Sequence, residues 1–171
     1  MKKFELTSEF NLNFFGRKFF RIKALVNIER YGVKAGDLGG WVEKEDNLSQ
    51  SGNAWVSGDA EVYGNAWVYG DAVVSGNAKV YGNAEVYGNA EVSGDADYAV
   101  IKGFGTVYRP TTFFRCHDGE ARVTCGCFYG TIDEFREQVK RTRKGKVADE
   151  YLKIADLMEY HFKKEDSGEN V

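Results

Sequence analysis

Six-residue repeats fill residues 49–96, as in "GNAKVYGNAEVYGNAEVSGDA" (76–96), and leave the chain few ways to fold. Valine recurs at every sixth position from 56 to 92, alanine stands two positions before each valine, and glycine followed by Asn or Asp precedes each alanine. Because side chains alternate across a strand, the Ala and Val of one repeat share a face, while Gly-Asn or Gly-Asp supplies a tight corner. Each repeat therefore predicts one short parallel strand and one corner, with alanine and valine stacked inside a coil.

A second period of 18 residues runs through the position after each valine. Serine fills this position at 57, 75 and 93, and tyrosine fills it at 63, 69, 81 and 87. Three repeats then make one turn of a triangular prism with layers about 4.8 Å apart. Tyr63 is expected to lie over Tyr81, and Tyr69 over Tyr87, while the residue between Ala and Val points outward. The alternative is that the period records duplication of 18-residue blocks with no structural meaning.

The inward Val with Ala two positions before it resembles the hexapeptide repeat of left-handed parallel β-helices, a family best known from acyltransferases. The segments "VKAGDLGGWVEKEDNLSQSGNAWV" (33–56) and "CGCFYGTIDEF" (125–135) are similar to those of small hexapeptide-repeat proteins of bacteria and their phages. The resemblance implies a left-handed coil, which is an exception to the usual right-handed crossover. It also implies a homotrimer with prisms side by side and ligands between subunits, and, for a phage accessory protein of this size, action against host defence.

We expect four regions in a fold that is mainly β. They are a β-rich N-terminal cap at 1–48, a short left-handed parallel β-helix with three hexads per coil at 49–98, a C-terminal β-hairpin with two α-helices at 99–164, and a flexible tail at 165–171. Caps are expected because a stack of repeats exposes apolar rims at both ends. Within the N-terminal cap, "FNLNFFGRKFFRIKALV" (10–26) predicts two strands that turn at Gly16 and Arg17.

Asp118-Gly119 is a two-residue turn signal and predicts a hairpin in which His117 lies opposite Glu120. That register places six residues on one buried face, namely Phe114, Cys116, Ala121, Val123, Cys125 and Cys127.

Two helices are expected after the hairpin. Thr131 and Glu134 form a capping-box pattern, which predicts a helix ending near Gly145. Apolar residues at helical spacing predict a second helix over about 147–162. The basic run "KRTRKGK" (140–146) is interpreted as a solvated helix C-terminus, where cations complement the helix dipole, and not as a nucleic-acid site.

The net charge of −3 argues against nucleic acid as a partner, but the charge is unevenly spread. Residues 49–96 carry six acids and one base, whereas residues 97–146 carry ten bases and six acids, so an anionic ligand is expected at the second segment. No apolar stretch approaches about 18 residues, so no membrane span is expected. Without an export signal in the sequence, a cytoplasmic location is expected.

The segment "KGFGTVYRPTT" (102–112) contains the components of a phosphate- or nucleotide-binding loop, with a structural linker as the alternative. Its bases supply charge, its tyrosine a stacking face and its threonines hydroxyl groups. The predicted ligand-binding residues, together with aromatic residues of the prism, are Lys102, Tyr108, Arg109, Thr111, Thr112, Arg115, Tyr63, Tyr69 and Trp67. Exposed aromatic patches indicate association, and the predicted interface residues of the homotrimer are Trp55, Tyr81 and Tyr87.

No catalytic residue, metal or cofactor is assigned from the sequence. Both histidines, His117 and His161, lie outside the repeats. Cys116, Cys125 and Cys127 have poor spacing for zinc and are interpreted as buried apolar residues.

These observations favour a non-catalytic, oligomeric binding protein. One version is a phage-encoded anti-defence sponge that sequesters a nucleotide immune signal between subunits, with aromatic rings on the base and Arg109 or Arg115 on the phosphates. One alternative is an acyltransferase-like enzyme that uses a coenzyme A thioester, with His117 as the base. Another is a protein–protein adaptor or inhibitor that docks on a host complex through the acidic prism.

Overall fold

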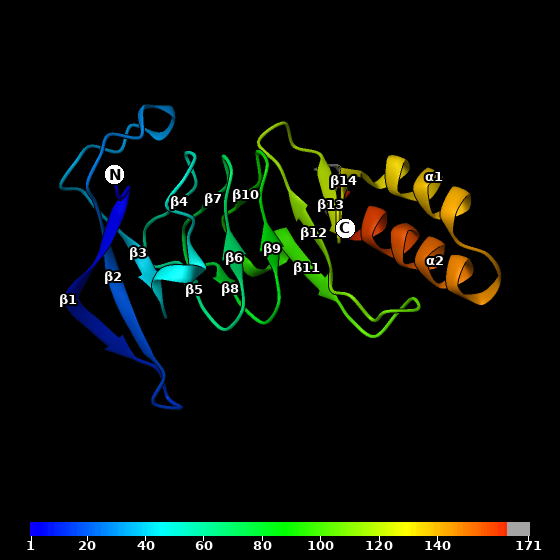
Figure 1. The fold of residues 1–171 in the computed structure, drawn as a ribbon, viewed down its shortest axis with the longest axis horizontal. Coiled ribbons are helices and arrows are strands. Elements are labelled where there is room, and N and C mark those ends of the chain that lie inside the picture. The colour runs from blue at the N-terminus through cyan, green and yellow to red at the C-terminus, as the bar shows by residue number, and fades with distance from the viewer. Residues whose placement is uncertain (164–171) are drawn as a thin grey trace, which may run out of the picture.

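The fold is mainly β and ends in two α-helices, and its parts follow one another along the long axis of the molecule (Figure 1). The structure, a computed structural model, describes residues 1–163, so the tail predicted at 165–171 lies outside the described residues. An N-terminal hairpin lies at one end, the short strands of the repeats in the middle and the helices at the other end (Figure 1). No helix among the described residues combines the length and the apolar character needed to cross a membrane.

An antiparallel hairpin forms the N-terminal end. β1 (Phe4–Leu12) pairs with β2 (Lys18–Ala24), which pairs on its other edge with β3 (Leu38–Val42). Gly16 in the connecting turn has a φ of 75°, a conformation that favours glycine. The strands and the turn predicted at Gly16 and Arg17 are therefore confirmed.

Seven two-residue strands form the repeat segment, and each combines one outward residue with one periodic valine. They are β4 (Trp55–Val56), β5 (Glu61–Val62), β6 (Trp67–Val68), β7 (Val73–Val74), β8 (Lys79–Val80), β9 (Glu85–Val86) and β10 (Glu91–Val92). Their pairs are parallel and join residues 18 apart, as in Val56 with Val74 and Val74 with Val92. The periodic valines have no exposed surface and the alanines from 54 to 90 at most 2%. The predicted inward face is thus confirmed.

The short strands belong to three different sheets. β4, β7 and β10 form one, β6 and β9 form another, and β5 and β8 extend the sheet of β1, β2 and β3. Since β3 pairs with β5 in parallel, the N-terminal strands continue one side of the repeat segment.

Both ends of the apolar interior are covered. At the N-terminal end, Phe4 and Ile22 belong to the same core as the periodic valines, and Lys3 Nζ donates a hydrogen bond to the Ala54 carbonyl at 2.7 Å. At the other end, Phe114 and Cys116 join this core. These contacts bury the rims that a short stack of repeats would leave in water.

The C-terminal region is an antiparallel sheet followed by two helices. Its elements are β11 (Tyr98–Ile101), β12 (Thr111–Arg115), β13 (Ala121–Cys125), β14 (Phe128–Thr131), α1 (Ile132–Thr142) and α2 (Gly145–Phe162). Both predicted helices are confirmed. The predicted hairpin is the centre of a four-stranded sheet, because β11 and β14 add an outer strand on each side.

The register of this hairpin differs from the predicted one by one residue. Arg115 lies opposite Ala121, and the Cys116 amide donates to the Glu120 carbonyl, so three residues form the turn instead of two. A shift of one residue exchanges the faces of one strand relative to its partner. The expectation of one shared face is therefore wrong: Phe114 and Cys116 pack on the core of the repeats, whereas Val123 packs on the helices.

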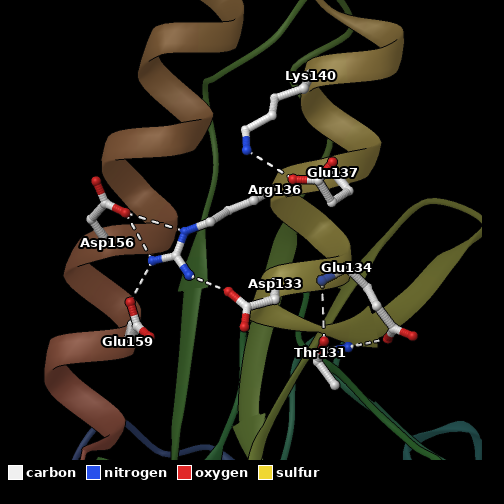
Figure 2. Close-up of polar contacts among 8 residues, drawn as sticks. All are labelled: Thr131, Asp133, Glu134, Arg136, Glu137, Lys140, Asp156 and Glu159. Atoms are coloured by element: carbon white, nitrogen blue, oxygen red, sulfur yellow. Dashed lines mark hydrogen bonds and ion pairs between the residues drawn. The ribbon is translucent and has the colours of Figure 1, made fainter.

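Polar contacts fix the start of α1 and its packing on α2 (Figure 2). Thr131 Oγ1 accepts from the Glu134 amide at 3.1 Å, and the Thr131 amide donates to the Glu134 carboxylate at 2.7 Å, which confirms the capping box. The Arg136 guanidinium on α1 then binds three carboxylates, two of which lie on α2 and join the helices. The three carboxylates are Asp133 at 2.7 Å on α1, and Asp156 at 2.8 Å and Glu159 at 2.6 Å on α2.

Candidate binding sites

A row of aromatic rings runs along the repeat segment onto the C-terminal sheet. The ring centroids of Tyr69 and Tyr87 lie 4.5 Å apart, with the ring planes 11° from parallel. Trp67 stacks on Tyr69 at 4.0 Å, and Tyr129 of β14 contacts Tyr87 at 4.5 Å. Trp67 keeps 43% of its surface exposed. We call these four residues the Trp67 row.

A second row contains the other predicted tyrosine pair. The centroids of Tyr63 and Tyr81 lie 5.1 Å apart, with planes 9° from parallel. Phe19 of β2 meets Tyr63 edge-on at 5.4 Å, and the Arg17 guanidinium lies 5.1 Å from the Tyr63 centroid. Tyr81 is 51% exposed. We call Phe19, Tyr63 and Tyr81 the Tyr81 row, and both tyrosine pairs are those predicted from the 18-residue spacing.

The rows present ring edges and hydroxyl groups more than ring faces, because neighbouring rings cover one another. Burial raises the pKa of the Tyr69 hydroxyl, and the nearby Glu85 carboxylate raises it further, so this hydroxyl stays protonated at neutral pH. A surface of apolar edges and neutral hydroxyl groups suits contact with another protein surface better than stacking on a planar base.

Trp55 is not available to an interface, since it is only 2% exposed. β3 covers it so closely that a Cβ atom on Gly39 would lie 2.7 Å from the indole ring. The prediction of Trp55 as an interface residue is therefore wrong, because a strand outside the repeats occupies this face.

Residues 102–110 form the connection between β11 and β12, and their three predicted ligand residues are exposed, namely Lys102, Tyr108 and Arg109. Thr111 and Thr112 are instead buried in β12. Thr111 Oγ1 donates to Cys125 Sγ at 3.2 Å, and Thr112 Oγ1 accepts from the Glu85 amide at 3.2 Å. The prediction that these two hydroxyl groups are open to a ligand is wrong, because β12 lies inside the sheet.

Arg115 points away from the Trp67 row. Its Nε donates to Asp97 at 3.2 Å, and its Nη1 donates to the carbonyl of Phe162, at the end of α2, at 3.3 Å. The adjacent Phe114 lies near Tyr87, with centroids 6.3 Å apart, on the opposite face of β12. One chain therefore does not bring Arg115 and the Trp67 row together.

The three cysteines are free thiols in different surroundings. Cys116 is buried, and burial raises the pKa of its thiol to about 12, which fits the predicted apolar role. Cys127 is exposed in the turn between β13 and β14, so its predicted burial is wrong. The part of the chain that the structure describes contains no group of three or more His, Cys, Asp or Glu side chains that could hold a metal ion.

The structure also contains a cleft of about 310 Å³, and no repeat or motif in the sequence links all of its lining residues. It lies between the 3₁₀ turn at Glu29–Tyr31 and the turn that carries His117, and His117 Nδ1 is 3.1 Å from Glu91 Oε2. The lining residues are Arg30, Tyr31, Val73, Asn89, Ala90, Glu91 and His117. Arg30 and Tyr31 belong to a segment without repeat or motif, so no sequence signal pairs them with His117.

No protein-family model matches this chain, and a search of curated proteins finds no significant match.

Proposed function

We propose that the repeat segment is a left-handed parallel β-helix with three hexads per coil, of the hexapeptide-repeat kind found in bacterial and phage proteins. Two observations support this proposal: the parallel pairs join residues 18 apart, and the periodic valines and alanines face one apolar interior. The tyrosine pairs follow the same 18-residue step.

On this fold we propose a non-catalytic, oligomeric binding protein, with prisms side by side in a homotrimer. The observation that carries the proposal is the exposure of Trp67 and Tyr81, each at the end of an ordered aromatic row. Removing apolar surface from water contributes about 25 cal/mol per Å², so lateral contact that covers both rows is favourable. Phe14 and Phe15 at the tip of the β1–β2 hairpin add apolar surface that one chain leaves uncovered.

The nucleotide-sponge version of this function places the ligand between subunits. Since Arg115 and the Trp67 row lie on opposite sides of β12, the phosphate contacts in this version come from the exposed Lys102 and Arg109 of a neighbouring chain. Such a ligand would draw its affinity from charge-assisted hydrogen bonds to the phosphates.

Calorimetry with a panel of cyclic and linear nucleotides tests the sponge version. We expect heat from at least one nucleotide and at least tenfold weaker binding after Arg109→Gln, because one charge-assisted contact is lost. The matched control is Arg141→Gln on α1, which removes the same charge and should leave the affinity unchanged. No heat from any nucleotide, or equal effects of the two substitutions, would contradict this version.

An acyltransferase-like enzyme is the second candidate, and the His117–Glu91 pair favours it. A carboxylate that holds Nδ1 at 3.1 Å leaves Nε2 to accept a proton from an acceptor hydroxyl. The His117 side chain is 81% exposed, however, so one chain does not exclude water from it. Lack of coenzyme A binding in the same calorimetric experiment would remove this candidate.

A further inference from the structure

The cleft beside His117 has walls that are held in place by hydrogen bonds to the repeat segment. The Tyr31 hydroxyl donates to the Asp71 carbonyl, and the His117 amide donates to the Asn89 carbonyl at 3.1 Å. Two turns that are distant in sequence are thereby fixed over the same side of the repeats. A volume of about 310 Å³ is at the lower end of the range of small-molecule pockets, roughly 300–1,000 Å³.

Unused hydrogen-bond donors line this cleft. Arg30 Nη1 forms an ion pair with Asp71 Oδ2 at 3.6 Å, and the guanidinium also lies beside the Tyr31 hydroxyl. Its five N–H groups exceed what these two neighbours can accept. Asn89 uses its side-chain oxygen to accept from the Tyr129 hydroxyl at 3.3 Å, while its amide nitrogen has no partner within residues 1–163. A guanidinium and an amide nitrogen together offer several donors to an acceptor-rich group.

The acids near the cleft already have positive or polar partners. Asp71 faces Arg30, and its other oxygen accepts from Asn53 at 2.7 Å. Asp71 engages only part of the Arg30 guanidinium, and Glu91 lies against His117. The remaining N–H groups of Arg30 and the Asn89 amide nitrogen therefore suit an acceptor-rich anionic head group.

Apolar groups form the remaining surface. Val73 and the buried Ala90 line the cleft next to the partly buried Tyr31 ring. A ligand that fills the cleft therefore has a polar and an apolar part.

We propose that this cleft binds a small molecule with one anionic head group, a carboxylate or a phosphate monoester, and a short apolar body. Arg30 and Asn89 hold the head group, and Val73 and Tyr31 contact the body. The site is formed by a single chain, so it depends neither on the homotrimer nor on a nucleotide between subunits.

The test uses the full-length ¹⁵N-labelled protein and four probes: benzoate, phenyl phosphate, neutral benzamide and inorganic phosphate. In two-dimensional amide spectra, benzoate or phenyl phosphate should shift the signals of Val73, Asn89, Glu91 and His117 in a saturable way. Stronger binding of one of the two assigns the head group as a carboxylate or as a phosphate ester. Benzamide should bind at least about tenfold more weakly, because it lacks the charge, and inorganic phosphate should bind more weakly than phenyl phosphate, because it lacks the apolar body.

Two substitutions complete the test. Arg30→Gln should weaken binding of the anionic probe about tenfold or more, since a charge-assisted contact is lost, while the other amide signals keep their positions. Arg141→Gln on α1 removes the same charge far from the cleft in sequence and should have no effect. Probe-induced shifts elsewhere, no shift at all, equal binding of benzamide, equal binding of inorganic phosphate, or an unaffected Arg30→Gln variant would each overturn the proposal.

Discussion

Lys3 buries an amino group beside the Ala54 carbonyl at the N-terminal end of the repeat interior. Desolvation lowers the pKa of this group from 10.5 to about 8, because burial disfavours the charged form. Between pH 8 and pH 10.5 the unfolded chain holds a proton that the folded chain has released. The free energy of unfolding therefore rises with pH in this window through Lys3.

Replacement of Lys3 by methionine should remove this pH dependence. From pH 7.5 to pH 10 the wild type should gain roughly 2 kcal/mol in free energy of unfolding relative to Lys3→Met, at about 1.4 kcal/mol per pKa unit. Urea unfolding at several pH values measures the difference. The tyrosine hydroxyls titrate in both proteins and cancel, so a difference that stays constant with pH would contradict this role of Lys3.

Arg136 is a second residue whose contribution to the free energy of unfolding can be measured by one substitution. Arg136→Met removes two ion pairs between α1 and α2 and one within α1, and leaves three carboxylates together (Figure 2), so the free energy of unfolding should fall by about 1–2 kcal/mol. The control Lys140→Met removes one exposed pair with Glu137 and should cost less than about 0.5 kcal/mol. Urea unfolding of the two variants provides the comparison, and equal losses would show that Arg136 does not join the helices.

At the scale of the strand and its corner, the sequence predicted the repeats better than any other part of the chain. Side chains alternate between the two faces of each short strand, and glycine forms each corner, so only one face of a repeat can point inward. Val74 and Ala72 lie on this inward face as expected. The β12–β13 hairpin was less predictable, because Asp118-Gly119 is compatible with two-residue and three-residue turns. One extra turn residue was enough to place Phe114 and Val123 on opposite sides of the sheet.

The corner glycines give a prediction for the contact between repeats 18 residues apart. Gly52 and Gly82 both have a φ of 72°, but a Cβ atom on Gly52 would lie 2.6 Å from the Gly70 carbonyl oxygen, whereas one on Gly82 would have no neighbour within 4 Å. Gly82→Ala should cost about 1 kcal/mol in free energy of unfolding from backbone strain alone, and Gly52→Ala at least about 1 kcal/mol more. Thermal and urea unfolding of both variants measure these costs. Equal losses would mean that the corner at Gly52 is not tightly packed on the corner at Gly70.

At the scale of the whole molecule, the unpredictable features are those that bring distant segments together. Trp55 is buried by β3, and the cleft of Arg30 and His117 requires two turns over the same repeats. Neither the period of the repeats nor any local motif contains this information, because it depends on how the ends of the chain fold back. The tyrosine rows were predictable, since their members are related by the period itself.

Because the Trp67 row and the Tyr81 row are exposed, we expect the chains to associate with one another. Trp67 and Tyr81 remain exposed, and Phe14 and Phe15 project from the N-terminal hairpin, so a single chain leaves several large aromatic side chains in water. Such surfaces are typical of subunit contacts.

Sedimentation equilibrium of the full-length protein tests this claim most directly. We expect three times the mass of one chain at micromolar concentration, and the mass of one chain for the double variant Trp67→Ser/Tyr81→Ser with an unchanged circular dichroism spectrum. Tyr160→Ser replaces an aromatic residue on α2 that is more exposed than Trp67 or Tyr81; it serves as the control and should remain trimeric. The mass of a single chain for the wild type, or a trimer that both sets of substitutions leave intact, would contradict association through the aromatic rows.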